Sequence, residues 1–395
     1  MDRRNFIKNS GLTIAGTMLL PSFIRALPLN KIAAGYKRLI IVQLSGGNDG
    51  LNTIIPIGQD PYFKLRPQLA LQKAELTSIT SELSINAALN PLASLFDKNQ
   101  WAIISDVGYP NPNRSHFRSM DIWQSASKEN EYLNTGWIGR YFDQHNESKS
   151  KVLEIDAKLS LANTGAKQKA ISFTNPNTLH KAVHMGWVEE SAKNSSKILT
   201  EDNLGYLYQT LGNLYETSDY LKSLHSLNSL GLDFGKSPLG HNLKVIAELM
   251  SAGADTKVFY TSMGGFDTHV NQKTGHAKLL NEYATSMSAF INALKKENLF
   301  NDTLIMTFSE FGRRVKQNAS KGTDHGTANS VFIMSGKLKK SGLINGPSNL
   351  LKLDNNDLIY RVDFRNIYAE IIEKWLEVSS DEIISNISSE RVGFI

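Results

Sequence analysis

The chain has 395 residues, of which 41% are hydrophobic and 21% are charged, and its formal net charge is +5. This length suits one large α/β domain or two ordinary ones. Nucleic-acid-binding proteins usually carry a concentrated basic face, and the mixed charge of this chain gives no support for that class. The absence of cysteine excludes disulfides, thiolate metal sites and a cysteine nucleophile, although it leaves the cellular compartment open.

Residues 1–30 have the pattern of an export signal. The sequence RRNFIK at residues 3–8 resembles the start of a twin-arginine signal, and an apolar stretch from Gly11 to about Ile24 follows it. That stretch is too short to span a bilayer comfortably. We therefore predict export to the periplasm or cell envelope, with no transmembrane span in the mature protein; the alternative is a surface helix. Without residues 1–27 the net charge falls to +2.

Short apolar runs alternate with amphipathic segments from residue 37 to residue 395. The predicted strands are, in chain order, Arg38–Leu44, Trp101–Val107, Val152–Ile155, Lys257–Thr261, Thr303–Phe308 and Ser330–Met334. The predicted helices are Pro91–Lys98, His116–Ser125, Trp137–His145, Leu243–Ala252, His276–Glu297 and Phe364–Glu377. This alternation predicts an α/β domain in which helices sandwich a mostly parallel sheet.

A segment from about Ser160 to Ser237 interrupts this alternation. It is polar and rich in Asn, Ser, Lys and Tyr, and its later half has the pattern of a helix. We predict an inserted cap, about residues 160–237, on the sheet domain rather than an independent domain. Its histidines, among them His180 and His184, are predicted to be surface residues.

Polar side chains follow four of the predicted strands, at the points where those strands end. The first strand ends in SGGNDG, residues 45–50, and the second leads into GYPNPNRSHFRSMDIW, residues 108–123. The stretch SMGGFDTHVNQKTGH occupies residues 262–276, and SEFGRRVKQNASKGTDHG occupies residues 309–326. Because sites in parallel sheets form at the carboxyl ends of strands, we expect these side chains to converge.

The stretch SGGNDG is compatible with several kinds of turn. Gly46, Gly47 and Gly50 do not have the G-x-G-x-x-G spacing of a dinucleotide cradle, and there is no Walker lysine, so phosphate loops are excluded. The small serine esterases have a similar G-x-N-D oxyanion block. They also need an upstream serine block and a late Asp-x-x-His, whereas Asp324 and His325 are adjacent here. A plain turn and a metal-ligand turn stay open.

The residue types at the four strand ends favour a metal site. Zinc and hard divalent cations take carboxylate oxygens and imidazole nitrogens, and one or two ions could clamp an anionic ester. Candidate ligands for Zn, Mn, Ca or Mg are Asp49, Asp267, His269, His276, Glu310 and His325. Arg114 and Arg313 could hold the other oxygens of the anion. Ser115, just before a helix, could be a nucleophile or an N-cap, and His116 could orient it.

Plainer structural roles compete with these assignments. Asp49 can be an ordinary turn residue, because turns favour Asn, Asp and Gly. Glu310 can form an ion pair with Arg313 or Arg314, and His276 can face solvent from the start of a helix.

Five stretches of the chain together resemble one protein family. They are LIIVQLSGGNDGLNT, NRSHFRSMDIWQS, GGFDTHVNQKTGH, SEFGRRVKQN and GTDHGTAN, in this order behind the twin-arginine-like start. They resemble the bacterial exported family of unknown function numbered fifteen-oh-one, which is grouped with the alkaline phosphatase and sulfatase superfamily. The resemblance covers the chain from about Lys37 to the C-terminus. It implies an alkaline phosphatase-like fold and a metal-dependent hydrolase. The implied substrate is an anionic phosphate or sulfate ester, for example from a polysaccharide or a lipid.

The superfamily pattern, carried over residue by residue, also implies individual roles. It implies metal ligands at Asp49, Asp267, Glu310 and His325, with His269 or His276 beside Asp267, and a nucleophile at Ser115. Phe311 departs from the pattern, because it stands where a histidine ligand is expected, and so the second metal is in question. The alternative function is therefore a non-catalytic envelope protein that binds a glycan, an anionic polymer or a protein partner.

Overall fold

The computed structural model describes residues 35–144, 151–167, 170–195, 203–227, 230–385 and 387–395. The predicted export signal, residues 1–30, lies outside the described residues. Within the described ranges, no helix is both long enough and apolar enough to cross a membrane.

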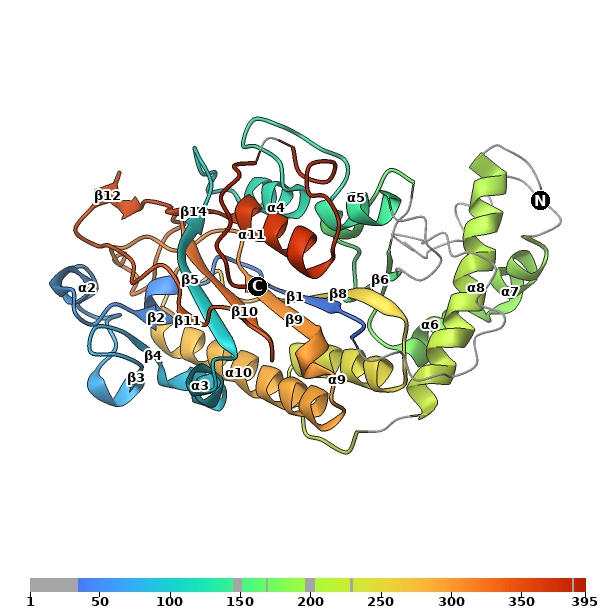
Figure 1. The fold of residues 1–395 in the computed structure, drawn as a ribbon, viewed down its shortest axis with the longest axis horizontal. Coiled ribbons are helices and arrows are strands. Elements are labelled where there is room, and N and C mark those ends of the chain that lie inside the picture. Colours follow the sequence, from blue (N-terminus) through green and yellow to red (C-terminus); the bar gives the residue numbers. More distant parts are fainter. Residues whose placement is uncertain (1–34, 145–150, 168–169, 196–202, 228–229, 386) are drawn as a thin grey trace.

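A nine-stranded sheet forms the middle of the described structure (Figure 1). Its strands are, in spatial order, β11 (Gly342–Leu343), β5 (Trp101–Gly108), β10 (Asn329–Met334), β9 (Thr303–Phe308), β1 (Arg38–Leu44), β8 (Thr256–Met263), β6 (Lys151–Ile155) and β7 (Ile171–Phe173), with β14 (Val362–Asp363) paired to β5. Neighbouring strands are parallel except at β10, which runs antiparallel to both β5 and β9. Every residue of β1 is buried, as expected for an apolar strand covered on both faces.

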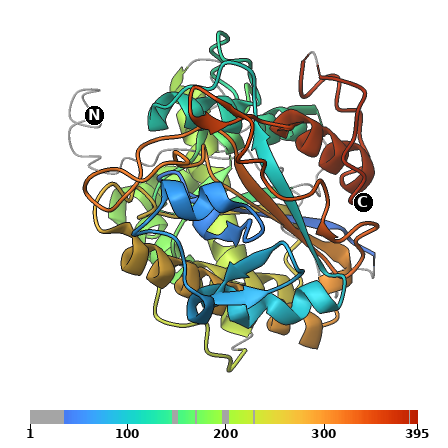
Figure 2. The ribbon, with the colours of Figure 1, turned by 90° about the vertical axis from the view of Figure 1, so that its left-hand side faces the viewer.

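Helices cover both faces of this sheet (Figures 1 and 2). One face carries α3 (Asn90–Asp97), α9 (Pro238–Ser251) and α10 (Gln272–Lys296), and the other carries α4 (His116–Ser125), α5 (Trp137–Gln144) and α11 (Phe364–Glu370). The apolar side chains between these layers form one large core cluster. The predicted fold, a mostly parallel sheet sandwiched by helices, is confirmed.

The predicted strands and helices all have counterparts in the structure, with small differences at their ends. Helix α9 begins earlier than predicted, at Pro238, because the Ser237 side chain caps it by accepting a hydrogen bond from Gly240 N. The last predicted helix is divided, since α11 ends at Glu370 and a π-helical turn, Ile371–Trp375, continues it. The predicted end of the third helix, His145, lies outside the described residues.

Smaller elements surround the central sheet. A three-stranded sheet has the order β2 (Ile54–Ile55), β4 (Ser84–Asn86) and β3 (Leu76–Ser78). Helix α2 (Asp60–Leu65) lies between β2 and β3 in the chain. A two-stranded sheet pairs β12 (Leu353–Asp354) with β13 (Asp357–Leu358). The segment predicted as an inserted cap contributes β7 to the edge of the central sheet. It also forms α6 (Pro176–Val183), α7 (Gly186–Lys193) and α8 (Asn203–Leu227), which lie together at one end of the molecule (Figure 1).

Glu154 in β6 is a buried acid beside the core. It is 2% exposed, and its Oε2 accepts hydrogen bonds from Ser160 N (2.8 Å), Ser160 Oγ (3.0 Å) and Asn163 Nδ2 (2.8 Å). Burial outweighs these bonds and raises the pKa of Glu154 to about 7. The protonated form is therefore favoured much more in the folded protein than in the unfolded chain.

We expect Glu154 to make the folded protein less stable as the pH rises. Its folded pKa lies above the ordinary value of 4.5, so its contribution to stability is present below that pH and is lost as the pH rises to about 7. This difference between the folded and unfolded pKa values corresponds to a contribution of about 3 kcal/mol to the free energy of unfolding. Between about pH 5 and about pH 8, urea denaturation should show Glu154→Gln gaining ~2–3 kcal/mol of unfolding free energy relative to the wild type. The same pH dependence in both proteins would contradict this expectation.

Candidate metal centre

The candidate site lies at the edge of the sheet where β1, β5, β8 and β9 end. These four strands point the same way, so their carboxyl ends share one edge, and the reversed strand β10 begins there. The loops at this edge carry His116 at the start of α4, Asp267 and His269 after β8, and His325 ahead of β10. The reversal of β10 explains why a residue that precedes a strand lies among residues that follow strands.

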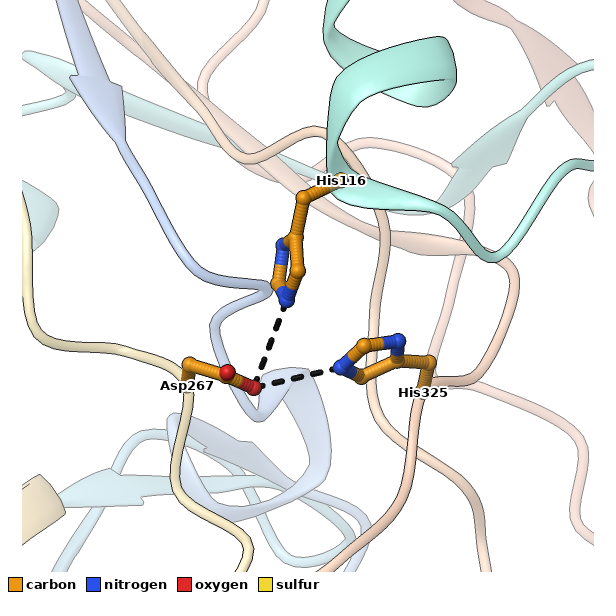
Figure 3. Close-up of side chains that lie close together, drawn as sticks. All are labelled: His116, Asp267 and His325. Atoms are coloured by element: carbon orange, nitrogen blue, oxygen red, sulfur yellow. Dashed lines mark hydrogen bonds and ion pairs between the residues drawn. The ribbon is translucent and has the colours of Figure 1, made fainter.

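Three imidazole nitrogens converge on one carboxylate oxygen in this cluster. Asp267 Oδ1 lies 3.4 Å from His116 Nε2, 2.9 Å from His269 Nε2 and 3.2 Å from His325 Nε2. Figure 3 shows the rings of His116 and His325 directed at Asp267, the first from the start of α4 and the second from the loop ahead of β10. The potential ligand atoms of His116, Asp267 and His325 all lie within 4.8 Å of one another. His269 Nε2 adds a further contact, 2.9 Å from His325 Nε2.

The partner of each Nδ1 atom determines which ring nitrogen carries the hydrogen. All three partners are oxygen acceptors: Glu310 Oε1 at 2.8 Å for His116, Asp324 Oδ1 at 3.3 Å for His269, and the Arg114 carbonyl oxygen at 2.8 Å for His325. Each neutral ring therefore donates from Nδ1 and keeps a lone pair on Nε2. These lone pairs face a carboxylate oxygen, which is an arrangement that needs a proton or a metal cation between the acceptors.

The turn after β1 shapes this cluster with its backbone. Gly46 has a φ of +117°, which L side chains rarely adopt, and a Cβ atom there would lie 2.5 Å from the backbone nitrogen of Asp267. The Gly46 N–H donates to Glu310 Oε1 at 2.8 Å. The glycine thus allows the loops after β1 and β8 to touch, and it holds the carboxylate that contacts His116. The hydrogen bond with Glu310 also raises the pKa of His116.

Arg313 joins the loops of the site. Its side chain is fully buried, and Nη2 lies 2.6 Å from Asp267 Oδ1. It also donates to the backbone carbonyls of Gly46, Gly47, Phe266 and Thr323. Burial would raise the pKa of Asp267, but the hydrogen bond from Arg313 and the neighbouring histidines outweigh it, so the pKa is lowered and the carboxylate is ionised. Sequence analysis predicted that Arg313 holds a substrate anion; in the structure its donors contact the protein itself.

Asp49 and His276, two of the predicted ligands, lie in a neighbouring buried network. Asp49 Oδ2 lies 2.6 Å from Arg66 Nη1, both side chains are fully buried, and Gln272 donates to the same oxygen. Burial would raise the pKa of Asp49, but the charge of Arg66 outweighs it and the pKa is lowered. His276 Nε2 lies 2.8 Å from Asn48 Oδ1, and burial lowers its pKa to about 4. Among the described residues, neither belongs to a group of three potential metal ligands.

Three of the four predicted catalytic residues, Arg114, Ser115 and His116, lie where the chain enters α4; the fourth is Arg313. Ser115 is exposed, stands at the N-cap position of α4 and makes no capping hydrogen bond with its side chain. The partly exposed Arg114 guanidinium pairs with Asp357, while the Arg114 carbonyl accepts from His325. His116, which sequence analysis assigned to catalysis, is placed by the structure among the potential ligands.

Phe311 forms an apolar wall of the site. Its ring centroid lies 4.8 Å from the ring centroids of both His116 and His325. It also lines a cavity of about 440 Å³, together with Arg114 and the aromatic residues Tyr109, Trp123 and Tyr360. The cavity therefore lies next to the cluster and shares the Phe311 ring with it.

The donor set of the cluster fits a divalent transition ion. One carboxylate oxygen and imidazole Nε2 atoms are donors that zinc takes, whereas Mg²⁺ and Ca²⁺ bind mainly through oxygen. His116 Nε2 is moreover buried and makes no hydrogen bond, although Asp267 Oδ1 lies 3.4 Å away. An ion in contact with it would supply the missing interaction.

Sequence reasoning did not foresee two features of this cluster. It did not assign His116 as a ligand, and it did not foresee Asp324 as the acceptor for His269. The partner of His116, Glu310, is 194 positions away, and Asp324 is 55 positions from His269. No local spacing could have indicated either contact.

Comparisons with known proteins give a family and several distant folds. The sequence model of a family described as "Protein of unknown function (DUF1501)" matches residues 101–376. A search of the curated proteins finds no match.

Solved structures with related folds include the crystal structure of Ps i-CgsB, with 9% identity, 89% of this chain and 74% of that chain covered, and a TM-score of 0.40. The C-terminal periplasmic domain of EcEptC from Escherichia coli, in complex with Zn, has 10% identity, 78% and 77% coverage, and a TM-score of 0.37. TAB5 alkaline phosphatase has 8% identity, 75% and 90% coverage, and a TM-score of 0.34. With TM-scores of 0.40 or less, these likenesses are too loose to carry an argument about activity.

Proposed function

We propose that this chain, which belongs to the DUF1501 family of proteins of unknown function, is an exported, metal-dependent hydrolase of phosphate or sulfate esters. One observation carries the proposal: three histidine Nε2 atoms converge on Asp267 Oδ1, and each Nδ1 atom faces an acceptor. Metal-ligating histidines characteristically donate their other ring N–H to a carboxylate or a carbonyl. The arrangement therefore has both the inner donors and the outer partners of a metal site.

The residues of the cluster divide into ligands and positioning residues. His116, Asp267 and His325 would hold one divalent ion, with His269 close enough to join them. Glu310 would orient the ring of His116. When bound, the ion would act as a Lewis acid that polarises an oxygen of the ester and stabilises the negative charge that develops on it. The imidazole-rich donor set favours Zn over Mn, Ca or Mg.

The start of α4 would bind the anionic group of the ester. The first turn of a helix presents backbone N–H groups that favour an anion, and the Ser115 side chain has no capping role there. Ser115 would attack the ester or orient a water molecule, and Arg114 would meet the anion at the rim of the site. The cavity of about 440 Å³ beside Phe311 would receive the rest of the substrate. A group of that size favours an anionic ester from a polysaccharide or a lipid.

Metal analysis combined with an ester screen tests this proposal. The natively purified protein is expected to hold one equivalent of metal more than His325→Ala does. It should hydrolyse a phosphomonoester, a phosphodiester or a sulfate ester, and a chelator should abolish the activity until metal is restored. If the wild type and His325→Ala hold the same metal and no ester is hydrolysed with added Zn, Mn, Mg or Ca, the hydrolase proposal is wrong. That result would favour the alternative, a non-catalytic envelope protein that binds a glycan, an anionic polymer or a protein partner.

Glu310→Gln is expected to weaken metal binding although it removes no proposed ligand. The carboxylate accepts hydrogen bonds from His116 Nδ1 and Gly46 N, and an amide in its place lacks the charge that orients the ring. Changes in such outer partners typically lower metal affinity about 10–100-fold. Competition with a chromophoric chelator measures the affinity, and Glu297→Gln, an exposed residue at the end of α10, is the control. Equal affinities in the two variants would exclude the orienting role.

A further inference from the structure

A second group of potential metal ligands lies in the segment that was predicted as an inserted cap. His180 belongs to α6, His184 follows that helix directly, and Asp219 belongs to α8. The potential ligand atoms of these three residues lie within 4.8 Å of one another. Sequence analysis predicted both histidines to be surface residues; their side chains are 19% and 20% exposed and lie against the same carboxylate.

Both rings direct Nε2 at one oxygen of Asp219. Asp219 Oδ1 lies 3.0 Å from His180 Nε2 and 3.1 Å from His184 Nε2. The spacing of four residues puts the histidines on one side of the helix, where their rings stack with centroids 3.8 Å apart. With metal–ligand bonds of about 2.0–2.2 Å, the ligand atoms around a tetrahedral ion are roughly 3.3 Å apart. The observed nitrogen–oxygen distances need only a small movement to admit an ion.

The hydrogen positions at His184 leave two acceptors facing each other. His184 Nδ1 lies 2.9 Å from the His180 carbonyl oxygen, which can only accept. A neutral His184 ring therefore donates from Nδ1 and turns the lone pair of Nε2 toward Asp219 Oδ1. Two acceptors 3.1 Å apart repel each other unless a cation lies between them.

A second proton on His184 and a bound metal ion are both cations of this kind. A metal ion would also bind His180 Nε2, which lies at the same oxygen of Asp219. The two rings are stacked, and Lys222 Nζ lies 3.4 Å from His180 Nδ1. Lys222 is exposed and can turn toward solvent when His180 Nδ1 carries the hydrogen.

We propose that His180, His184 and Asp219 bind one divalent transition-metal ion, with zinc as the best match, and that the ion joins α6 to α8. Two imidazoles and one carboxylate are zinc donors and leave a fourth position for water. About half of the Asp219 side chain is exposed (49%), so the ion has access from solvent. Val183 of α6 and Leu221 and Leu224 of α8 belong to the large apolar core, so the ion would add to a contact between helices that already pack together. A metal bound to the folded form would add to the stability of this region.

A zinc titration of the full chain tests this site independently of the proposed hydrolase. The titration uses His325→Ala, in which the first cluster has lost a ligand, so that the remaining binding reports on the second site. This protein is expected to bind one equivalent of Zn²⁺, to unfold at a higher temperature with zinc, and to give visible absorption bands with Co²⁺. Adding His184→Ala or Asp219→Asn should lower the zinc affinity at least about 10–100-fold. His241 lies on α9, and its ring contacts the Thr174 carbonyl. Adding His241→Ala should leave the affinity unchanged.

Two variants keep this test decisive. Asp219→Asn preserves the size of the side chain, so it tests the site even where His184→Ala is too unstable to purify. If Asp219→Asn keeps the zinc affinity and the cobalt spectrum of the His325→Ala protein, the three residues are an ion-paired group only and the proposal is overturned. Because binding is read by titration and not by hydrolysis, this result does not depend on whether the first cluster is catalytic.

Discussion

Asp267→Asn is expected to lower the rate of ester hydrolysis by at least about a hundredfold and to release the metal from the first cluster. Asp267 Oδ1 is the atom on which three histidine Nε2 atoms converge. Asparagine keeps the shape of the side chain but lacks the negative charge that would bind the cation. The same charge balances Arg313, which lies 2.6 Å away and would otherwise repel the ion. Steady-state hydrolysis and the metal content of dialysed protein measure the two effects.

The control for Asp267→Asn is Asp121→Asn, an exposed aspartate on α4. It makes the same chemical change on the helix that carries His116, and it should keep both the metal and the activity. If Asp267→Asn also keeps both, the metal of the active protein is bound elsewhere. If it loses hydrolysis and keeps the metal, Asp267 contacts the substrate and is not a ligand.

The strands of the fold could be predicted because each central strand is a short apolar run. The sequence RLIIVQL becomes β1, and every residue of it is buried between parallel neighbours. The direction of β10 could not be predicted, because an apolar run has the same pattern in either direction. That direction depends on pairing with β5 and β9, which are distant in the sequence, and it is what brings His325 to the site.

The loops of the candidate site could be predicted, but the contacts between their side chains could not. Four strand ends were expected to converge, and the structure does bring His116, Asp267, His269 and His325 together. Asp49 has the same signature as Asp267, an acidic residue in the loop that follows a strand, yet it is paired with Arg66. Arg66 lies in a loop without a recognisable motif, so no pattern in the sequence indicated that pairing.

The role of Arg313 also could not be predicted from the sequence. An arginine after a strand in a predicted phosphate or sulfate site is expected to hold the anion. In the structure, the backbone carbonyl oxygens of Gly46 and Gly47 instead accept hydrogen bonds from its buried guanidinium. A sequence pattern records residue types and their spacing, whereas the role of a buried arginine depends on which backbone acceptors the fold brings near it.

Arg66→Met is expected to lower the free energy of unfolding by about 3–5 kcal/mol, because it leaves the Asp49 carboxylate buried without its cation. The two side chains have no exposed surface, and their charged atoms lie 2.6 Å apart. Arg66 also donates to the carbonyls of Arg314 and Val315, at 2.8 Å each. These residues directly follow Arg313, so the loss should also loosen the loop that holds the first cluster. Denaturation by urea measures the stability.

The control for Arg66→Met is Lys64→Met on the neighbouring helix α2. Lys64 pairs with Asp60 at 3.3 Å, but both side chains are largely exposed, so the loss should cost less than about 1 kcal/mol. The double variant Asp49→Asn with Arg66→Met should cost less than the sum of the two single variants, because it removes both members of the buried pair. Additive costs would show that Asp49 and Arg66 do not stabilise each other.

The variant Asp49→Asn tests whether Asp49 has a structural role or is a metal ligand. If Asp49 supports the loop through Arg66, the variant should be less stable, yet under conditions where it is folded it should bind zinc at the first cluster with nearly the wild-type affinity. If Asp49 is a ligand, as the strand-end pattern predicted, the affinity should fall sharply while the stability of the metal-free protein changes little. Each hypothesis therefore predicts a loss in one measurement and little change in the other. A zinc titration and a urea denaturation of this one variant therefore decide whether the turn SGGNDG contributes a ligand to the site or only the backbone that shapes it.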